Sequence, residues 1–299
     1  DVTLGKGIKT LGNAVFEDAV VRTISIYGQV QVIPKDFCHN ALHLETVHLP
    51  EGVMHLLDRA FLSAERLQFI SLPDSLTHIG DQCFTATSLS ELRLPATLRT
   101  IQEDALLGTN IRMLVIPELV TELPTFSLGD MRELTTLVIM NDAIEISKDA
   151  ITEFNPLQVI CAGRNGRLKE RLTKLWNRNI KIVEGLSDLH HHEGVVYGLF
   201  DNDHWAVIGY EQRELRDKVT ILESIESRTV TRMLNHCLAY SNIQDLFISD
   251  TISEIGDYIL LGAKRLERLR LPYGLKSELH HWIRGNTNVS VRQTDDVID

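Results

Sequence analysis

The residues with the strongest potential for chemistry are four neighbours of metal-ligand type, His190, His191, His192 and Glu193. Imidazole and carboxylate groups bind zinc and related metals. Neighbouring side chains of an extended segment point to alternate sides, however, and no second ligand pair at a metal-binding spacing accompanies the run. We therefore interpret it as a solvated linker and expect no metal.

Two further segments resemble ligand loops. Asp201, Asn202 and Asp203 have the oxygen chemistry of a calcium loop but lack the Gly at position six and the Glu at position twelve of an EF-hand, so they predict a turn. Gly163–Gly166 lies between an expected strand and an expected helix, with Arg164 and Arg167 close by, which leaves an anion at the helix start as an alternative. It lacks the GxxxxGK[ST] pattern of a P-loop.

Catalytic and redox signatures are absent from the sequence. The motifs GxSxG and HExxH do not occur, and Gly5, Gly7 and Gly12 miss the GxGxxG spacing. The four cysteines, at positions 38, 83, 161 and 237, form no CxxC pair, so they indicate buried free thiols. The sequence predicts a protein that is not an enzyme and binds no cofactor.

Charge and hydropathy restrict the partners. The chain of 299 residues has 41 acidic and 30 basic residues, a net charge of −11, which is the wrong sign for a nucleic-acid binder. No apolar run approaches the roughly 20 residues that span a bilayer, so we expect no membrane insertion.

An internal repeat positions all of these residues. Each unit carries an inward apolar marker, and successive markers are 22 or 23 residues apart. The markers are Val2, Ile24, Val47, Ile70, Leu92, Leu114, Leu137 and Ile160. Alternating apolar positions predict a short strand with one buried face, followed by a helical or irregular return. Because one unit cannot bury its face alone, the units must stack into a solenoid with a parallel strand ribbon.

The repeated pattern resembles a known family. Leu67–Pro73 reads LxxIxLP, Ile79-Gly80 follows, and the small-aromatic pair Cys83-Phe84 completes the unit. Period, Pro, Gly and pair recur together, as in the BspA-like (Treponema pallidum-type) leucine-rich repeat family. The resemblance implies an α/β, right-handed leucine-rich-repeat solenoid, a bacterial surface or secreted location, and binding of proteins or cells.

Two arrays are expected, 1–185 and 186–299, with a seam near Glu184–Asp188. Each ends in a cap made of a helical stretch and a strand: Leu168–Trp176 with a strand from Ile180, and Leu275–Ile283 with a strand from Val289. The second array opens with a hairpin, Val195–Phe200 and Trp205–Tyr210, whose turn has Asn/Asp chemistry. The chain begins inside a strand, so we expect the natural protein to continue upstream or to be a mature or trimmed form. The resemblance implies an extracellular or cell-surface location.

The outward face of the ribbon is the candidate binding surface, because side chains that flank an inward marker project from it. Phe69, Met113, Val115 and Val138 are apolar there, which solubility does not require. The candidate partner-binding residues are Thr46, His48, Phe69, Ser71, Glu91, Arg93, Met113, Val115, Thr136 and Val138.

The sequence thus predicts a non-enzymatic scaffold, a monomer or weak oligomer, that binds a protein partner or mediates adhesion. Two alternatives stay open. One is a passive structural spacer of a longer envelope protein, and the other is a glycan- or metal-dependent adhesion module.

Overall fold

The structure is a computed structural model that describes residues 1–152, 157–163, 166–176, 180–272, 275 and 290–293. The chain is a β-solenoid of about 11 turns with parallel strands, mostly strand with little helix. The expected solenoid with parallel strands is thereby confirmed. The predicted α/β class overstates the helix, because α1 (Arg167–Leu175) is the one helix among the described residues. The chain divides into two compact units, Asp1–Val183 and Glu184–Asp299.

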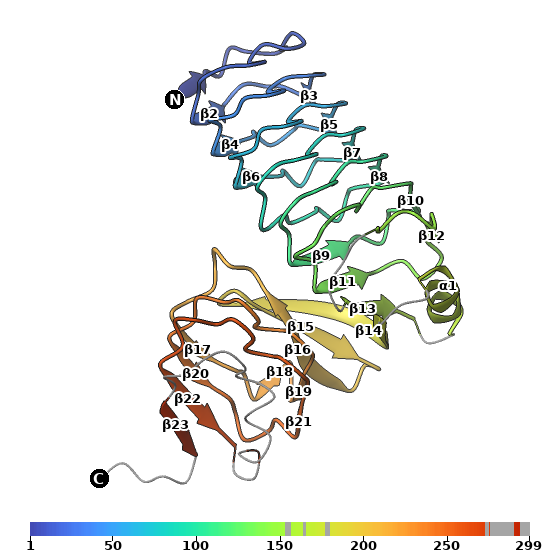
Figure 1. The fold of residues 1–299 in the computed structure, drawn as a ribbon, viewed down its shortest axis with the longest axis vertical. Coiled ribbons are helices and arrows are strands. Elements are labelled where there is room, and N and C mark those ends of the chain that lie inside the picture. The colour runs from blue at the N-terminus through green and yellow to red at the C-terminus, as the bar shows by residue number, and fades with distance from the viewer. Residues whose placement is uncertain (153–156, 164–165, 177–179, 273–274, 276–289, 294–299) are drawn as a thin grey trace. The chain divides into compact units, whose positions relative to one another are not determined.

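The ribbon of the first unit begins with four parallel strands that pair in chain order: β1 (Val2–Leu4), β2 (Thr23–Ile26), β4 (Thr46–His48) and β6 (Phe69–Ser71). Their register aligns Val2 with Ile24, Ile24 with Val47 and Val47 with Ile70. These are the predicted markers, so the apolar period fixes the register as expected. The ribbon is seen in Figure 1 as one of two rows along the coils.

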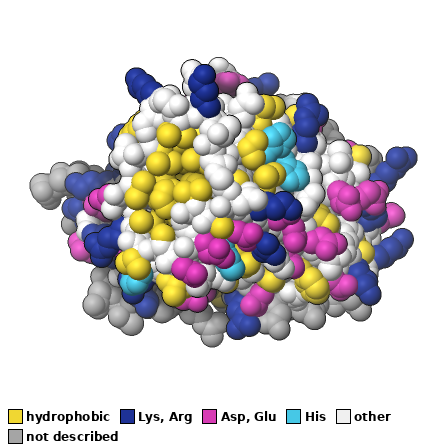
Figure 2. Space-filling model, turned by 90° about the horizontal axis from the view of Figure 1, so that it is seen from above, with side chains coloured by type: hydrophobic (Ala, Val, Ile, Leu, Met, Phe, Trp, Pro, Cys, Tyr) yellow, Lys and Arg dark blue, Asp and Glu magenta, His cyan; other side chains and the backbone are white. Residues whose placement is uncertain are grey.

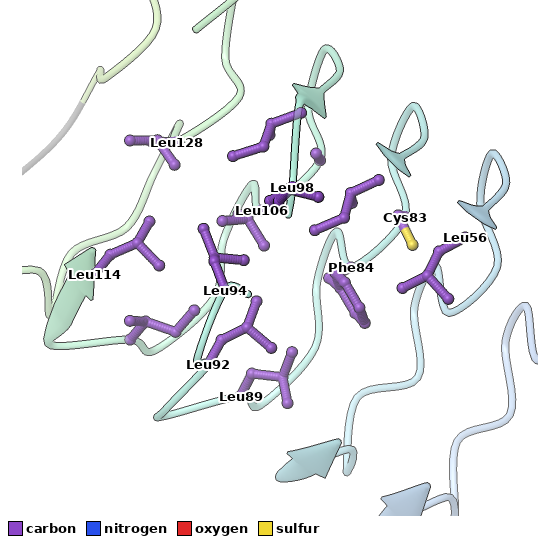
Figure 3. Packing of buried hydrophobic residues seen from close by; sticks show 14 of the residues in the cluster. Leu56, Cys83, Phe84, Leu89, Leu92, Leu94, Leu98, Leu106, Leu114 and Leu128 are labelled. Carbon is purple, nitrogen blue, oxygen red and sulfur yellow. The ribbon is translucent and has the colours of Figure 1, made fainter. Parts of the chain in front are cut away.

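The predicted strand around Leu92 does not form: the backbone of Glu91–Pro95 is not paired as a strand with the neighbouring coils. The side chains still alternate as in a strand, since Leu92 and Leu94 are buried and Arg93 between them is exposed. Figure 3 shows Leu89, Leu92 and Leu94 among the packed core side chains. Core packing therefore holds this segment in line without strand hydrogen bonds.

The ribbon resumes in three strands, β9 (Met113–Ile116), β11 (Thr136–Ile139) and β13 (Leu157–Ala162). Leu137 pairs with Leu114 and with Val159, so Val159 occupies the inward position. The predicted marker Ile160 is wrong by one residue. The run Val159-Ile160-Cys161 is apolar throughout, and all three residues are buried, so the sequence pattern could not choose between the two faces of the strand.

A second row of parallel pairs closes each coil on the other side of the core (Figure 1). It consists of β3 (Val32–Ile33), β5 (His55–Leu56), β7 (His78–Ile79) and β8 (Thr100–Ile101), and of the pair β10 (Glu122–Leu123) and β12 (Glu145–Ile146). In each of these two-residue strands the second residue is buried and the first is more exposed. The return segment of the unit is thus strand and turn, where the sequence predicted a helical or irregular segment.

The turns between the two rows lock the coils together. Cys38 donates its N–H to the carbonyl of Ala60 at 2.7 Å, and Phe61 donates to Cys83 at 2.9 Å. The residue two positions before each donor has a left-handed backbone, with φ of 57° at both Asp36 and Arg59. A left-handed backbone costs free energy for any residue other than glycine, and the hydrogen bonds to the next coil offset that cost.

The second unit begins with the predicted hairpin. β15 (Val195–Phe200) and β16 (His204–Tyr210) pair antiparallel, and β14 (Ile180–His192) pairs antiparallel with β15. β19 (Arg228–Met233) adds to β16 in parallel, and the short strands β18 (Ser224–Ile225) and β21 (Glu254–Ile255) flank β19.

A second parallel ribbon follows in this unit, with the order β17 (Lys218–Thr220), β20 (Asp245–Phe247), β22 (Arg268–Leu271) and β23 (Ser290–Gln293). Val219 aligns with Leu246, Leu246 with Leu269, and Leu269 with Val291. The predicted markers of this array are confirmed. Its expected cap helix, Leu275–Ile283, lies outside the described residues apart from Leu275, whereas the cap helix of the first array is present as α1.

Candidate functional site

The histidine run lies in strand β14, so its interpretation as a solvated linker is wrong. His190 pairs with Tyr197 and His192 with Val195, because the apolar strand β15 offers this segment a ladder partner. The His190 ring lies 6.0 Å from that of Trp205. Among the residues that the structure describes, no group of three His, Cys, Asp or Glu side chains is arranged to hold a metal ion.

The hairpin turn and the cysteines match their expected structures. Asp201 and Asn202, in the turn between β15 and β16, have φ of 57° and 55°. Asp and Asn tolerate this left-handed conformation. All four cysteines are buried. Burial raises the pKa of the Cys83 and Cys237 thiols, which keeps them protonated and unreactive at neutral pH.

The glycine-flanked segment is a helix start. Gly166 caps α1 with φ of 69°, and the neighbouring Arg164 and Asn165 lie outside the described residues. One of the basic side chains near this segment is already used, because Arg171 donates to Glu145 at 3.0 Å in the preceding coil. The helix start therefore gives no support for an anion site.

The predicted ribbon residues fall into three groups. The structure places Thr46, Phe69, Met113 and Val115 as partly exposed and His48 and Ser71 as exposed, on β4, β6 and β9. Glu91 is partly exposed and Arg93 exposed, on the segment without ladder bonds. The register brings Thr46 beside Phe69 and His48 beside Ser71, and the rings of His48 and Phe69 are 6.1 Å apart.

Thr136 and Val138 form the third group, and their expected exposure is wrong. They are 2% and 0% exposed, because all four residues of β11 are buried and both faces of this strand are covered. The sequence pattern had marked one covered face only. The accessible part of the predicted surface is therefore carried by β4, β6, the Glu91–Arg93 segment and β9.

Apolar exposure is not confined to the ribbon. Large apolar side chains are exposed elsewhere in the first unit, including Val20 at 81%, Leu42 at 42% and Leu119 at 40%. Figure 2 shows a face on which apolar side chains gather in one patch with acidic and basic side chains beyond it. Exposure alone does not select a binding surface, but these residues supply matched controls for experiments on the ribbon.

The sequence reasoning missed an acidic groove of about 530 Å³ in the first unit. Its lining includes the carboxyl groups of Asp58, Asp81, Glu103 and Glu122, and contains no histidine or cysteine. The signal was present in the repeat, since residues 58, 81 and 103 occupy the same position of three successive units. These residues lie two positions after β5, β7 and β8, away from the strand ribbon on which the predicted binding surface lies.

The charges in this groove affect each other. Burial, followed by the neighbouring carboxyl groups of Asp104 and Asp58, raises the pKa of Asp81. The pKa of Asp58 is lowered instead, because Lys35 donates a hydrogen bond to it at 2.6 Å. The groove repels anions and has the charge to attract cations.

Six copies of the family model for the BspA type leucine-rich repeat region match the chain, over residues 1–68, 57–165 and 217–289. The chain belongs to the BspA-type leucine-rich repeat family. The predicted resemblance is confirmed. Comparison of this BspA-type chain with curated proteins finds no match. Among the described residues, no helix has the length and apolar character to cross a membrane.

Solved structures similar to this BspA-type chain are bacterial leucine-rich repeat proteins. A leucine-rich cell surface protein from Faecalibacterium prausnitzii A2-165 is 14% identical, with 99% of this chain and 88% of that chain covered and a TM-score of 0.38. A protein from Bacteroides ovatus ATCC 8483 is 16% identical, with 98% and 83% covered and a TM-score of 0.31. One from Eubacterium ventriosum ATCC 27560 is 14% identical, with 94% and 70% covered and a TM-score of 0.36. We draw no function from these similarities.

Proposed function

We propose that this BspA-type chain is a non-enzymatic scaffold that binds a protein partner through the outward face of its first ribbon. The observation that carries the proposal is the contrast within single strands. On β6 and β9, Ile70 and Leu114 are buried, while Phe69, Met113 and Val115 beside them are apolar and partly exposed. Apolar side chains at the centre of a patch, surrounded by Thr, Ser and His, are typical of a protein interface.

The rigidity of the ribbon supports the same proposal. Neighbouring coils are bound to each other through turn hydrogen bonds and the core, and through the ribbon ladder except at Glu91–Pro95, so the outward side chains are held in place before a partner arrives. Association then costs little loss of backbone freedom on this side. A preformed repeat surface is the usual binding surface of a solenoid.

Catalysis receives no support from the groups in the first unit that would have to perform it. The Cys83 thiol is buried with a raised pKa, and the acidic groove pairs carboxyl groups with no histidine or cysteine in its lining. A glycan module is less favoured, because flat rings that stack on sugars are scarce on the ribbon, where Phe69 is the one Phe, Tyr or Trp among the candidate positions.

A surface or secreted location in a bacterium is part of the proposal, supported by the family to which the chain belongs. Fractionation of expressing cells, followed by protease treatment of intact cells, tests it. Protection of the chain from protease in intact cells, together with recovery in the soluble cell interior, would contradict it.

The binding proposal is tested by capture from host-cell surface and bacterial envelope extracts. The ribbon variant carries Phe69→Ser, Met113→Ser and Val115→Ser, and the matched control carries Val20→Ser, Leu42→Ser and Leu119→Ser. The proposal expects partners that the native chain and the control retain and the ribbon variant loses. Equal capture by all three proteins, at equal unfolding temperatures, contradicts the proposal, and so does the absence of any specific partner.

A further inference from the structure

The ribbon of the second unit presents chemistry that the first ribbon lacks. Its strands β17, β20 and β22 lie side by side (Figure 1), and the register places Lys218, Asp245 and Arg268 in one row and Thr220, Phe247 and Arg270 in the other. Lys218, Arg268 and Arg270 are exposed, and Phe247 is partly exposed. Three cations thus project from one small sheet face of a chain whose net charge is −11.

The single acid on this face orients a cation. Asp245 is 2% exposed, whereas the side chain of Arg268 is 63% exposed. Arg268 donates Nε–H to Asp245 Oδ1 at 2.6 Å and a second hydrogen bond to Oδ2. The bidentate pair holds the guanidinium plane in a fixed direction and leaves further N–H donors toward solvent. The hydrogen bond from Arg268 also lowers the pKa of Asp245, so the pair stays ionised at neutral pH.

The spacing of the cations fits an extended chain. Arg268 and Arg270 lie two residues apart on the same face of β22, a separation of roughly 6.8 Å. Side chains at alternate positions of an extended peptide have the same spacing, and carboxylates are the groups that arginine pairs with in bidentate geometry. Phe247, aligned with Arg270, adds an apolar contact beside the charges.

We propose that the outward face of β17, β20 and β22 binds an extended acidic segment of a partner protein, with carboxylates at alternate positions opposite Arg268 and Arg270 and with Lys218 adding positive charge. This surface is separate from the first ribbon and does not depend on it. The charge complementarity selects an acidic ligand, and the alternate spacing selects a peptide over a uniformly charged polymer.

The test is fluorescence anisotropy of the full chain with a labelled peptide of alternating Glu and Thr. A peptide with the same number of Glu residues at every third position, where successive carboxylates lie on opposite faces of an extended chain, and a peptide of alternating Gln and Thr serve as ligand controls. The test variant is Lys218→Gln with Arg270→Gln, which keeps the Asp245–Arg268 pair. The matched protein control is Lys264→Gln with Arg265→Gln, which removes two exposed cations of the same unit outside the ribbon.

The proposal expects the alternating acidic peptide to bind more tightly than the peptide with Glu at every third position, and the Gln peptide not to bind. The test variant should lose about tenfold in affinity, and the control variant less than about twofold.

Three results would overturn the proposal. One is no binding of the acidic peptides, and another is equal loss in the test and control variants, which would indicate a general effect of charge. The third is binding of heparin without binding of either acidic peptide, which would assign the face to an anionic glycan. The first-ribbon variant with Phe69→Ser, Met113→Ser and Val115→Ser should keep peptide binding, so this proposal and the proposed function fail independently.

Discussion

Phe61 and Phe84 stack face to face in neighbouring coils, with ring centroids 5.4 Å apart and planes within 3° of each other. Phe37 meets Phe61 edge to face at 6.2 Å, so the rings form a column along the core. The column is built from the small-aromatic pair of the repeat. Its residues are fully buried, and they join coils that also share backbone hydrogen bonds, aliphatic contacts and ion pairs such as Lys35–Asp58.

Loss of one ring in this column should destabilise the first unit strongly. We expect Phe84→Ala to lower the free energy of unfolding by about 3–5 kcal/mol, because a ring-sized cavity is left between two coils. Phe126→Ala, at a Phe that is 42% exposed, is the matched control and should cost less than about 1 kcal/mol. Chemical denaturation measures both. Similar losses for the two variants would show that the column does not carry the packing.

The repeated glycine is required by a close approach between coils. A Cβ at Gly80 would lie 2.7 Å from the Asp58 backbone nitrogen, whereas one at Gly5 would meet nothing within 4 Å. We expect Gly80→Ala to destabilise by about 1–3 kcal/mol and Gly5→Ala by less than about 0.5 kcal/mol. Thermal unfolding compares them. An unchanged stability of Gly80→Ala would contradict the coil spacing described here.

Replacement of the two aspartates of the acidic groove, Asp81 and Asp58, should change the stability of the protein in opposite directions at neutral pH. Because the folded pKa of Asp81 is raised, its charge opposes folding above that pKa, so Asp81→Asn should stabilise the protein at pH 7 by about 0.5 kcal/mol. The gain should vanish as the pH falls toward the ordinary value of about 3.9.

Asp58 has a lowered folded pKa, and its charge stabilises the fold above the ordinary value. Asp58→Asn should therefore destabilise at pH 7, and the loss should disappear as the pH falls through the folded pKa. Unfolding curves between acid and neutral pH measure both variants. A stabilising Asp58→Asn, or a destabilising Asp81→Asn, would contradict the charge arrangement of the groove.

The thiols give a simple test of burial. All four cysteines are buried, so the native protein at neutral pH should react with a thiol reagent far more slowly than the unfolded chain. Reaction with a chromogenic disulfide before and after denaturation measures this. Rapid labelling of Cys83 or Cys237 in the native state would place those coils in a different packing.

The sequence was sufficient to predict features that follow from the spacing of the apolar markers. It was insufficient where both faces of a strand are buried. Val47 and Leu269 are inward because polar neighbours flank an apolar marker, and their register follows from that pattern. At Ile160 both neighbours, Val159 and Cys161, are apolar, and the predicted register is wrong by one residue. The burial of Val138 has the same cause, since the covering of its second face depends on contacts that no local pattern records.

Pairing between distant segments was likewise beyond local reasoning. The polar run His190–His192 predicts a linker from sequence alone. Its backbone pairing with β15 instead makes it part of a strand. The acidic groove and the cationic second ribbon form only when successive repeat coils stack within one unit, because their residues are far apart in the chain. The candidate surface on β4, β6 and β9 was predicted, because its residues flank buried markers in strands with one accessible face.

The most direct test of the account is site-specific photo-crosslinking from the first ribbon. A photoreactive phenylalanine is placed at Phe69 or Met113, and at Leu42 or Leu119 as controls, and the protein is irradiated in the extract that yields a partner. If the outward face of the first ribbon binds the partner, Phe69 and Met113 should crosslink to it, and Leu42 and Leu119 should not. Crosslinks from the control positions alone would contradict the claim that the outward ribbon face is the binding surface.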